Sequence, residues 1–521
     1  MSEPSLTTMR RDIPALADAT FDLLIVGAGI YGACAAWDAA LRGLTVAVVD
    51  QGDFGAATSA NSLRLVHGGL RYLARGEFSR MRESIGERST LLRIAPGLVE
   101  PIPVLVPTYG AGTRGRIAHA AALALNDLLS LKRNRHLGPD RVIPDGRLVS
   151  REECLRLFPW FDSNGLSGGA IWHDALLRRP ERLTLSFVQA AVATGAVAAN
   201  YLRVTELLTR DGAVRGVRAI DSVTGTELEI RARAVLVAAG PWTERLVATA
   251  TRQRPGESQG RALALNVVIG RKLADVGFGV RSRSGRREDP VCGGHRFLFC
   301  APQGKGSALG TWYAANAIDP QATRKHGISA LLREFNDSCP GLDLASSDVV
   351  GCQWGWLPLK EGREPGRSDA LAEHPRIADH CEQGIRHLLS VEGVKYTTAR
   401  LVAEQAIDRV FSSLGRTSPP CCTAELRLPG AEDRAGAEPG AIPAREEIVG
   451  AVRNEMAINL ADIVFRRTAL GAIPGPDRAA VEAVARTAGA ELGWDPLRQE
   501  AEIDTVLRQA GVDGATLEAV G

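Results

Sequence analysis

The chain has 521 residues, a length that accommodates roughly two to four domains. Hydrophobic residues make up 45% and charged residues 23%, which excludes a disordered chain, a collagen and a coiled coil. The 62 basic and 60 acidic residues give a net charge of +2, so the chain lacks the large positive charge that is typical of nucleic-acid-binding proteins. The nine cysteines are too sparse for a disulfide scaffold, and none has a spacing typical of a zinc site. We therefore expect reduced thiols and no metal.

The first 20 residues lack the apolar segment of a secretory signal, and the pair Arg10-Arg11 is not followed by one. No uninterrupted run of about 20 apolar residues occurs, so no helix is expected to span a membrane. The sequence therefore predicts a cytoplasmic protein.

The strongest local pattern is a βαβ unit in residues 21–50. A buried strand is predicted over 21–26, a helix over 30–42 and a second strand over 45–49. Gly27, Gly29 and Gly32 lie between the first strand and the helix, where they permit a tight turn, approach of the backbone to a pyrophosphate and close helix packing. Asp50 ends the second strand, where an acidic side chain accepts hydrogen bonds from a ribose diol. This unit predicts dinucleotide binding.

Further along the chain, residues 114–136 are predicted to form a helix with basic residues at both ends. Residues 230–242 form another buried strand that ends in a turn at Gly240. Residues 391–411 predict a turn opening a long helix, and residues 429–445 predict an exposed linker. The remaining residues have three helical patterns, which indicate a small all-α C-terminal domain.

The glycine motif alone does not distinguish NAD from FAD. FAD is favoured because the motif opens a long chain, because no second such motif occurs, and because another strand ending in Ala-Ala-Gly lies far downstream at 238–240.

Residues 57–96, with the string HGGLRYL, closely resemble the FAD-dependent glycerol-3-phosphate dehydrogenases of the D-amino-acid-oxidase-like superfamily. Residues 235–242, 390–407 and 455–468 resemble later segments of the same family. The resemblance implies an α/β and α+β fold with a Rossmann-like FAD domain, a mixed-sheet substrate domain and a small all-α C-terminal domain. The implied oxidoreductase region covers 20–420, with flavin segments at about 20–95, 180–250 and 345–412, substrate segments at about 96–180 and 255–345, and helices at 421–521.

The resemblance also implies which residues contact the flavin. They are Ser59, Ser62, the Leu65–Gly69 stretch with His67, and Gly393, Lys395, Thr397 and Thr398. Two alternatives stay open: a purely structural role for His67, and capping of the following helix by the two threonines.

For the substrate, Arg71, Tyr72 and Lys395 match positions that the family uses around a phosphorylated polyol. Three positions depart from the family pattern. An arginine is replaced by Leu357, with Lys360 or Arg363 close enough to substitute; a histidine falls at Asn266; and a Gly-Thr-Thr-Asp stretch reads Gly310-Thr311-Trp312-Tyr313. Loss of a cation and of a titratable group would change which substrate binds and how its proton leaves.

The implied reaction is oxidation of sn-glycerol 3-phosphate to dihydroxyacetone phosphate, by hydride transfer from a carbinol carbon to flavin N5. His67, then Lys395, then His295 are candidates for the base, and Arg71 with Lys395 would polarise the developing ketone. The alternatives are a flavoenzyme of this fold that oxidises another hydroxy or amino compound, and a flavoprotein without turnover.

The family implies quinone or oxygen as electron acceptor. Arg114, Arg116, Lys132, Arg133 and Arg135 would let the 114–136 helix lie on anionic lipid at the cytoplasmic face of the inner membrane. An ordinary amphipathic helix with solvated ends is the alternative, and a homodimer is compatible with the resemblance.

Overall fold

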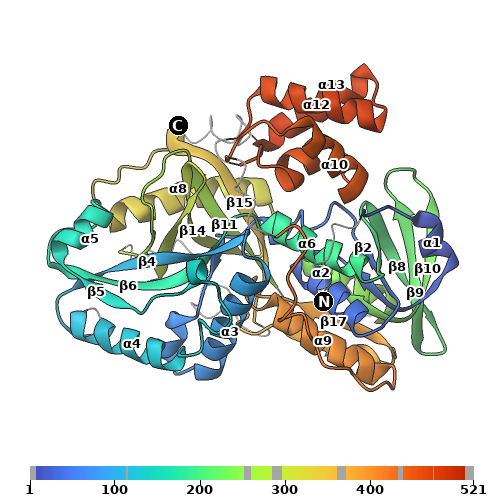
Figure 1. Cartoon of the computed structure of the whole chain (residues 1–521), viewed down its shortest axis with the longest axis horizontal. Helices are drawn as coiled ribbons and strands as arrows, with labels where there is room; N and C mark the ends of the chain where they lie inside the picture. Colours follow the sequence, from blue (N-terminus) through green and yellow to red (C-terminus); the bar gives the residue numbers. More distant parts are fainter. Residues whose placement is uncertain are drawn as a thin grey trace.

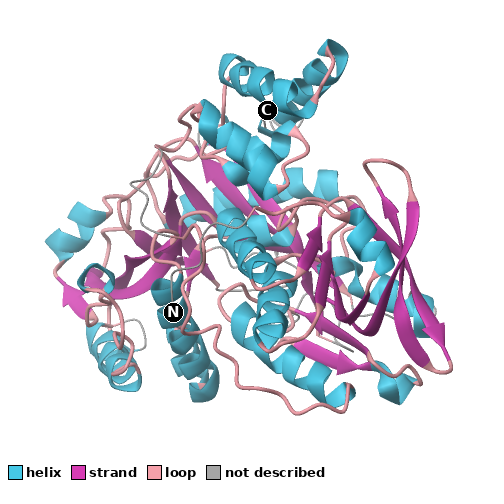
Figure 2. Ribbon diagram, turned by 45° about the vertical axis from the view of Figure 1, so that its right-hand side comes forward, coloured by secondary structure: helices cyan, strands magenta, loops and turns pink. Residues whose placement is uncertain are grey.

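The computed structural model describes residues 8–112, 115–251, 260–283, 296–360, 371–431, 438–472 and 475–510. Two β-sheets lie side by side, and a group of helices from the end of the chain projects from them (Figure 1). Figure 2 shows the strands gathered into these two groups, with helices packed around each. The predicted fold class is confirmed.

The first sheet has the order β16-β17-β10-β1-β2-β7, and β8 and β9 extend it from β10. Its strands are β1 (Thr20–Val26), β2 (Val46–Val49), β7 (Val197–Ala199), β8 (Leu202–Arg210), β9 (Ala213–Asp221), β10 (Glu227–Val237), β16 (Arg376–Asp379) and β17 (Leu388–Glu392). The central strands β17, β10, β1, β2 and β7 are parallel. They read as near-continuous apolar runs because a parallel sheet is buried on both faces. The predicted βαβ unit is present.

Three helices cover one face of this sheet: α2 (Ile30–Leu41), α6 (Pro180–Ala193) and α9 (Ala399–Ser413). Leu23 and Ile25 of β1 point toward them, while Leu24 points to the opposite face. This opposite face is covered by the β8–β9 hairpin together with α1 (Ile13–Asp18) and α7 (Thr243–Thr251). All three parallel strands β1, β2 and β10 therefore end at the same edge, where loops can meet a ligand.

The second sheet has the order β15-β11-β14-β13-β12-β4-β6-β3, with β5 paired to β6. Its strands are β3 (Leu65–Val66), β4 (Val99–Tyr109), β5 (Arg147–Val149), β6 (Leu166–Leu177), β11 (Arg261–Ile269), β12 (Gly277–Arg281), β13 (Phe297–Gln303), β14 (Gly306–Ala315) and β15 (Val349–Pro358). The sequence places residues 345–358 with the flavin segments, whereas β15 pairs antiparallel with β11 in this sheet. The division into domains otherwise stays a prediction.

The two faces of the second sheet differ in chemistry. Leu263, Leu265, Val267 and Leu309 belong to an apolar core that includes α8 (Pro320–Ser338) and α5 (Arg151–Leu157). Since side chains alternate along a strand, the other face carries the residues between them. These are mostly small: Gly279, Ala301, Ala308, Gly310, Ala264 and Gly355, with Asn266 and Gln353 among them. A face of this kind leaves room for a flat ring.

Two further helices, α3 (Phe78–Ile94) and α4 (Arg116–Leu129), pack beside β4 and β6. The predicted 114–136 helix is shorter than expected. It ends at Leu129, and the backbone N–H of Ser130 bonds back to Asn126. The chain then turns so that the side chains of Arg133 and Asn134 donate to the Ile143 carbonyl oxygen.

The C-terminal helices have their own apolar core, as predicted. They are α10 (Arg445–Glu455), α11 (Leu460–Asp462), a π-helical turn over Ile463–Arg467, α12 (Arg478–Leu492) and α13 (Pro496–Ala510). Asp53, which follows β2, joins them to the first sheet: it accepts hydrogen bonds from Arg466 and from both terminal nitrogens of Arg467. This pairing buries three charges at one junction.

Candidate active site

The glycine motif forms the turn between β1 and α2 as predicted. Gly27 has a φ of +101°, and a Cβ atom there would lie 2.5 Å from the carbonyl oxygen of Ala238. A Cβ on Gly32 would lie 1.8 Å from the carbonyl oxygen of Gly27. No side chain fits at either position, so the backbone of this turn stays open, with the N-terminus of α2 behind it. Gly240, at the end of β10, adds a second positive-φ turn at the same edge.

Asp50 lies at the end of β2 beside this turn. Its carboxylate accepts hydrogen bonds from the N–H groups of Ala28 (2.7 Å) and Gly52 (3.0 Å). Burial raises the pKa of Asp50 to about 6. Each carboxylate oxygen has a second lone pair, so Asp50 can accept further bonds from a ribose diol. The residues present at this edge fit the adenosine and pyrophosphate parts of FAD.

The predicted serines lie in the loop that follows. Ser59 Oγ accepts the N–H of Ile30 at 2.9 Å, in the first turn of α2, where the helix has unpaired donors. Ser62 Oγ accepts the N–H of Arg64 at 3.3 Å. Ser59 therefore lies at the N-terminus of α2, where the pyrophosphate is predicted to bind. Ser62 bonds to the backbone directly before β3, which begins at Leu65.

Gly393 and Lys395 lie in the turn after β17, next to α2. A Cβ on Gly393 would lie 2.0 Å from the ring of Tyr31, and the Tyr31 hydroxyl donates to the Lys395 carbonyl at 2.6 Å. Thr397 and Thr398 are buried. Thr398 occupies the N-cap position of α9 but makes no side-chain capping bond, so capping does not account for its hydroxyl. The turn is therefore held against α2, directly after the glycine motif, and its contact with the flavin stays a prediction.

His67 contacts a buried carboxylate that the sequence analysis did not single out. Its Nδ1 lies 3.1 Å from Asp174 Oδ2, and Asp174 also accepts the N–H of Gly68 (2.6 Å), Trp172 Nε1 (3.1 Å) and Arg88 Nη1 (3.1 Å). Burial alone would raise the pKa of Asp174, but the hydrogen bond and charge of His67, the charge of Arg88 and the Gly68 amide together lower it below its usual range. Asp174 is therefore ionised at neutral pH, and an ionised carboxylate only accepts. His67 Nδ1 must donate to it, which leaves Nε2 as the nitrogen that can take a proton.

The side chain of His67 is 42% exposed and lies beside Phe299 on the small-residue face of the second sheet. Phe299 neighbours Gly310, and a Cβ on Gly310 would lie 2.1 Å from Asn266 Oδ1. Asn266 in turn accepts the Thr311 hydroxyl at 2.7 Å. The structure thus brings His67, Asn266 and Thr311, which lie far apart in sequence, to one sheet face.

Besides Asn266, the two other departures from the family pattern have different outcomes. Leu357 lies in the same strand and on the same face as Gln353 and Gly355, so an apolar side chain faces the predicted flavin side. Trp312, in contrast, is buried in the opposite core against α8, because the register shifts between Leu265 and Asn266. The interpretation of Trp312 as a substrate-side residue is therefore wrong.

Tyr72 is buried in the turn Leu70–Arg75 that follows the glycine pair after His67. The Lys395 ammonium lies 4.2 Å and the Arg80 guanidinium 4.6 Å from its ring centroid. Lys395 and Tyr72 thus lie together, while their contact with a substrate stays a prediction. The backbone of Arg71 belongs to the same turn, while its side chain, like His295 and Arg363, lies outside the described part.

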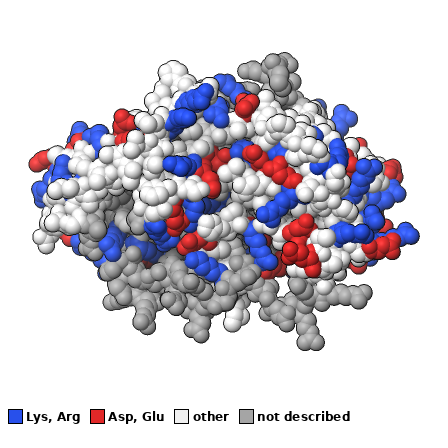
Figure 3. Space-filling model, turned by 90° about the horizontal axis from the view of Figure 1, so that it is seen from below, with Lys and Arg blue, Asp and Glu red and all other residues white. Residues whose placement is uncertain are grey.

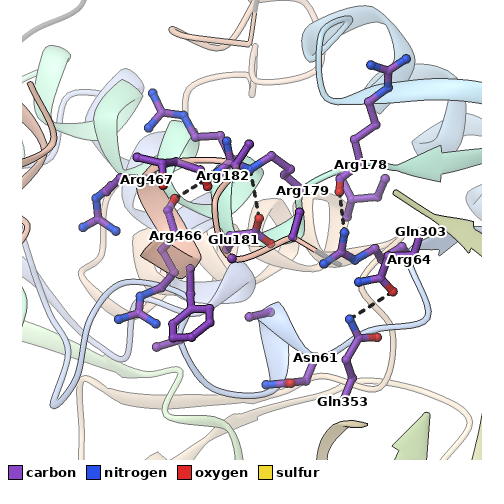
Figure 4. Close-up of a pocket in the computed structure, with 18 of the residues that line it drawn as sticks. Asn61, Arg64, Arg178, Arg179, Glu181, Arg182, Gln303, Gln353, Arg466 and Arg467 are labelled. Atoms are coloured by element: carbon purple, nitrogen blue, oxygen red, sulfur yellow. Dashed lines mark hydrogen bonds and ion pairs between the residues drawn. The ribbon is translucent and has the colours of Figure 1, made fainter. Parts of the chain in front are cut away.

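A cleft with a volume of about 2290 Å³ runs between the two sheets and the C-terminal helices. Its lining includes Thr58, beside Ser59, and Gly355. In Figure 4, Arg179, Arg182, Arg466 and Arg467 gather on one side of it, and Arg64, Arg178, Gln303 and Gln353 on the other. Most of these arginines are paired, for example Arg182 with Glu455 at 2.6 Å and Arg467 with Asp53 at 2.7 Å. The cleft exceeds the size of an ordinary small-ligand pocket, and its walls include Gly52 and Asp53 after β2 as well as Gln303 and Gln353 of the second sheet.

Among the described residues, no group of three or more His, Cys, Asp or Glu side chains is arranged to hold a metal ion. In the same part of the chain, no helix is both long and apolar enough to cross a membrane.

Taken together, the glycine turn, Asp50 and the facing small-residue sheet define an oxidoreductase of the dinucleotide-binding class. The family model of FAD-dependent oxidoreductases matches residues 22–409, and that of the C-terminal domain of alpha-glycerophosphate oxidase matches residues 433–499. The chain belongs to this family of FAD-dependent oxidoreductases, of the glycerol-3-phosphate dehydrogenase type, and FAD is its cofactor.

Curated relatives support this assignment. The chain is 31% identical to a glycerol-3-phosphate dehydrogenase of Synechocystis sp. over 81% of its own length and 75% of that protein. It is 32% identical to a probable mitochondrial glycerol-3-phosphate dehydrogenase of Caenorhabditis elegans, over 82% of its own length and 58% of the relative. The chain thus corresponds to little more than half of the nematode protein. A solved glycerol-3-phosphate dehydrogenase from Bacillus halodurans, complexed with FAD, shares the fold, with a TM-score of 0.72, 23% identity, and coverage of 97% of this chain and 98% of that one.

Proposed function

We propose that this chain oxidises sn-glycerol 3-phosphate to dihydroxyacetone phosphate. The observation that carries the proposal is the His67–Asp174 pair beside Phe299. His67 lies a few residues before Tyr72, whose ring contacts the Lys395 ammonium. The names of the curated relatives supply the substrate class.

The chain's own residues have distinct tasks in this proposal. When bound, FAD supplies the acceptor for the hydride of the substrate carbon. His67 Nε2 takes the hydroxyl proton, while Asp174 holds the imidazole in the required tautomer and stabilises the imidazolium that forms. Lys395 provides positive charge for the developing ketone oxygen or for the phosphate.

The test is steady-state turnover with a quinone analogue as acceptor. We expect oxidation of sn-glycerol 3-phosphate and much weaker oxidation of glycerol, which lacks the phosphate. Equal activity on both compounds, or activity only on an amino compound, would contradict the proposal. A second candidate function is oxidation of another hydroxy or amino substrate by a flavoenzyme of this fold. Leu357 and Asn266 favour it, because a cation and a titratable group of the family pattern are missing from the substrate side.

We further propose that electrons leave at a lipid surface, to quinone, through contact made by α4. Only Leu123 of this helix is buried. Its exposed side carries Ile117, Ala121, Leu125 and Leu128, and Leu131 continues the stripe. Seen from below in Figure 3, uncharged residues gather on the side where α4 lies.

The charges around α4 only partly agree with the sequence-based expectation. Lys132 and Arg135 are exposed at its C-terminal end, where they can reach anionic headgroups. Arg133, in contrast, is buried and pairs with Asp145 and Asp127, and Arg116 donates to the Val149 carbonyl at 2.6 Å. Arg133 is therefore wrongly predicted as a lipid contact.

A further inference from the structure

A carboxylate surrounded by three cations lies beside the candidate active site. Glu373 Oε1 is 3.1 Å from Arg75 Nη1 and 3.2 Å from Lys360 Nζ, and Glu373 Oε2 is 3.4 Å from Arg80 Nη1. The four side chains come from the turn Leu70–Arg75, from α3, from the residues just after β15 and from the segment before β16. We call this group the Glu373 cluster.

The Tyr72 ring connects the Glu373 cluster to Lys395. The Arg80 guanidinium and the Lys395 ammonium both lie over the ring of Tyr72. This ring is placed against Gly69, two residues after His67: a Cβ on Gly69 would lie 2.7 Å from it. The cluster therefore borders the place where the substrate's reacting carbon is expected.

The charge balance of the cluster favours a larger anion than a carboxylate. Arg75, Arg80 and Lys360 contribute three positive charges, while Glu373 and Glu77, which pairs with Arg80, contribute two negative ones. A phosphomonoester has three terminal oxygens and up to two negative charges, and guanidinium groups bind such oxygens in pairs. The cations lower the pKa of Glu373, although burial acts in the opposite direction, so this side chain is ionised at neutral pH.

The Glu373 side chain can leave without unfolding its segment. It is 27% exposed, as is Lys360. The main chain is held by a separate bond, because Arg80 Nη2 donates to the Glu373 carbonyl oxygen at 2.5 Å, while Arg80 Nη1 contacts the carboxylate. The carboxylate can therefore swing away from the cations while residue 373 stays in place.

We propose that the Glu373 cluster binds the phosphate of the substrate, and that the Glu373 carboxylate occupies this subsite until the phosphate displaces it. This inference rests on the proposed function and deepens it. Lys360 lies three residues beyond Leu357, the position where the family pattern has an arginine, and it supplies a positive charge close to that position.

The experiment measures binding of inorganic phosphate to the oxidised holoenzyme by titration calorimetry. We expect Glu373→Gln to raise the affinity about tenfold, because a charged competitor is removed while the amide keeps its size. Lys360→Met and Arg75→Met should each lower the affinity by a similar factor. Glu153→Gln is the matched control: Glu153 pairs with Arg147 at 2.7 Å on the far side of the second sheet's core, and its loss should change nothing.

Unchanged or weaker phosphate binding by folded Glu373→Gln would overturn the inference, since the carboxylate would then only fasten its segment. Glu373→Ala gives the same comparison if the glutamine variant folds poorly. The outcome is separable from the proposed function, because phosphate binding requires no turnover. If sn-glycerol 3-phosphate is a substrate, Glu373→Gln should also lower its KM about tenfold with kcat unchanged.

Discussion

At the scale of single residues, the chemistry depends on a pair that only the fold brings together. His67 is in a segment with a recognisable sequence, but Asp174 lies 107 residues away in β6 and has no sequence signal of its own. Its role follows from burial among four donors, which keeps it ionised and fixes the tautomer of His67.

We predict that His67→Gln lowers kcat by about 10²–10⁴-fold, the usual contribution of a positioned base, while FAD stays bound. Stopped-flow reduction of the variant holoenzyme measures this directly. A variant that loses flavin instead, or keeps full activity, would show that His67 serves only the structure. Asp174→Asn should have a smaller effect in the same direction.

Sequence reasoning also missed the partners of Lys395 and Tyr72. Arg80, which lies over the Tyr72 ring, and its own partner Glu373 are separated by almost 300 positions. By contrast, the glycine turn and Asp50 were predictable because local sterics alone determine them: a backbone oxygen lies where the Cβ of any residue at position 32 would be.

At the scale of elements, the βαβ unit and the C-terminal helices followed from hydrophobic period, whereas β4 did not. This strand contains Pro101, Pro103 and Pro107, which argue against a strand, yet it pairs along its whole length with β6. The outward side of α4 was likewise visible only in part, since composition showed an amphipathic helix but not that its apolar side faces away from the protein.

We predict that Leu128→Asp combined with Leu131→Asp reduces pelleting with anionic liposomes at least several-fold, because charged side chains replace apolar ones that are 63% and 75% exposed. Leu497→Asp is the matched control, since Leu497 is 84% exposed on α13. Turnover with a water-soluble acceptor should be the same in all three proteins. If wild-type protein does not pellet at low salt, the lipid contact is wrong.

At the scale of the whole molecule, the C-terminal helices are joined to the nucleotide-binding sheet through buried charges. Asp53 pairs with Arg466 and Arg467, Glu455 with Arg182, and the Tyr201 hydroxyl donates to Asp462 at 2.5 Å. The same helices line the large cleft, so this junction sets one of its walls.

We predict that Asp53→Asn destabilises the folded protein by about 3–5 kcal/mol, because the buried Arg467 guanidinium loses its nearest counter-charge and Arg466 keeps only its pairing with Asp462. Burial opposes ionisation of Asp53, but the two arginines lower its pKa below the ordinary value. Because the pKa of Asp53 is lower in the folded protein than in the unfolded chain, its ionisation stabilises the fold at any pH above the unfolded pKa of about 3.9. This stabilisation is lost as the pH falls from there through the pKa of the folded state. Denaturant unfolding between neutral and acid pH should therefore show a smaller acid-induced loss in Asp53→Asn than in the wild type; equal losses would contradict this.

The most direct measurement is the visible absorption of the flavin under anaerobic conditions after addition of sn-glycerol 3-phosphate. We expect rapid bleaching of the flavin in a single turnover. A flavin that dithionite reduces but sn-glycerol 3-phosphate does not would contradict the assigned substrate, while the FAD fold would stand.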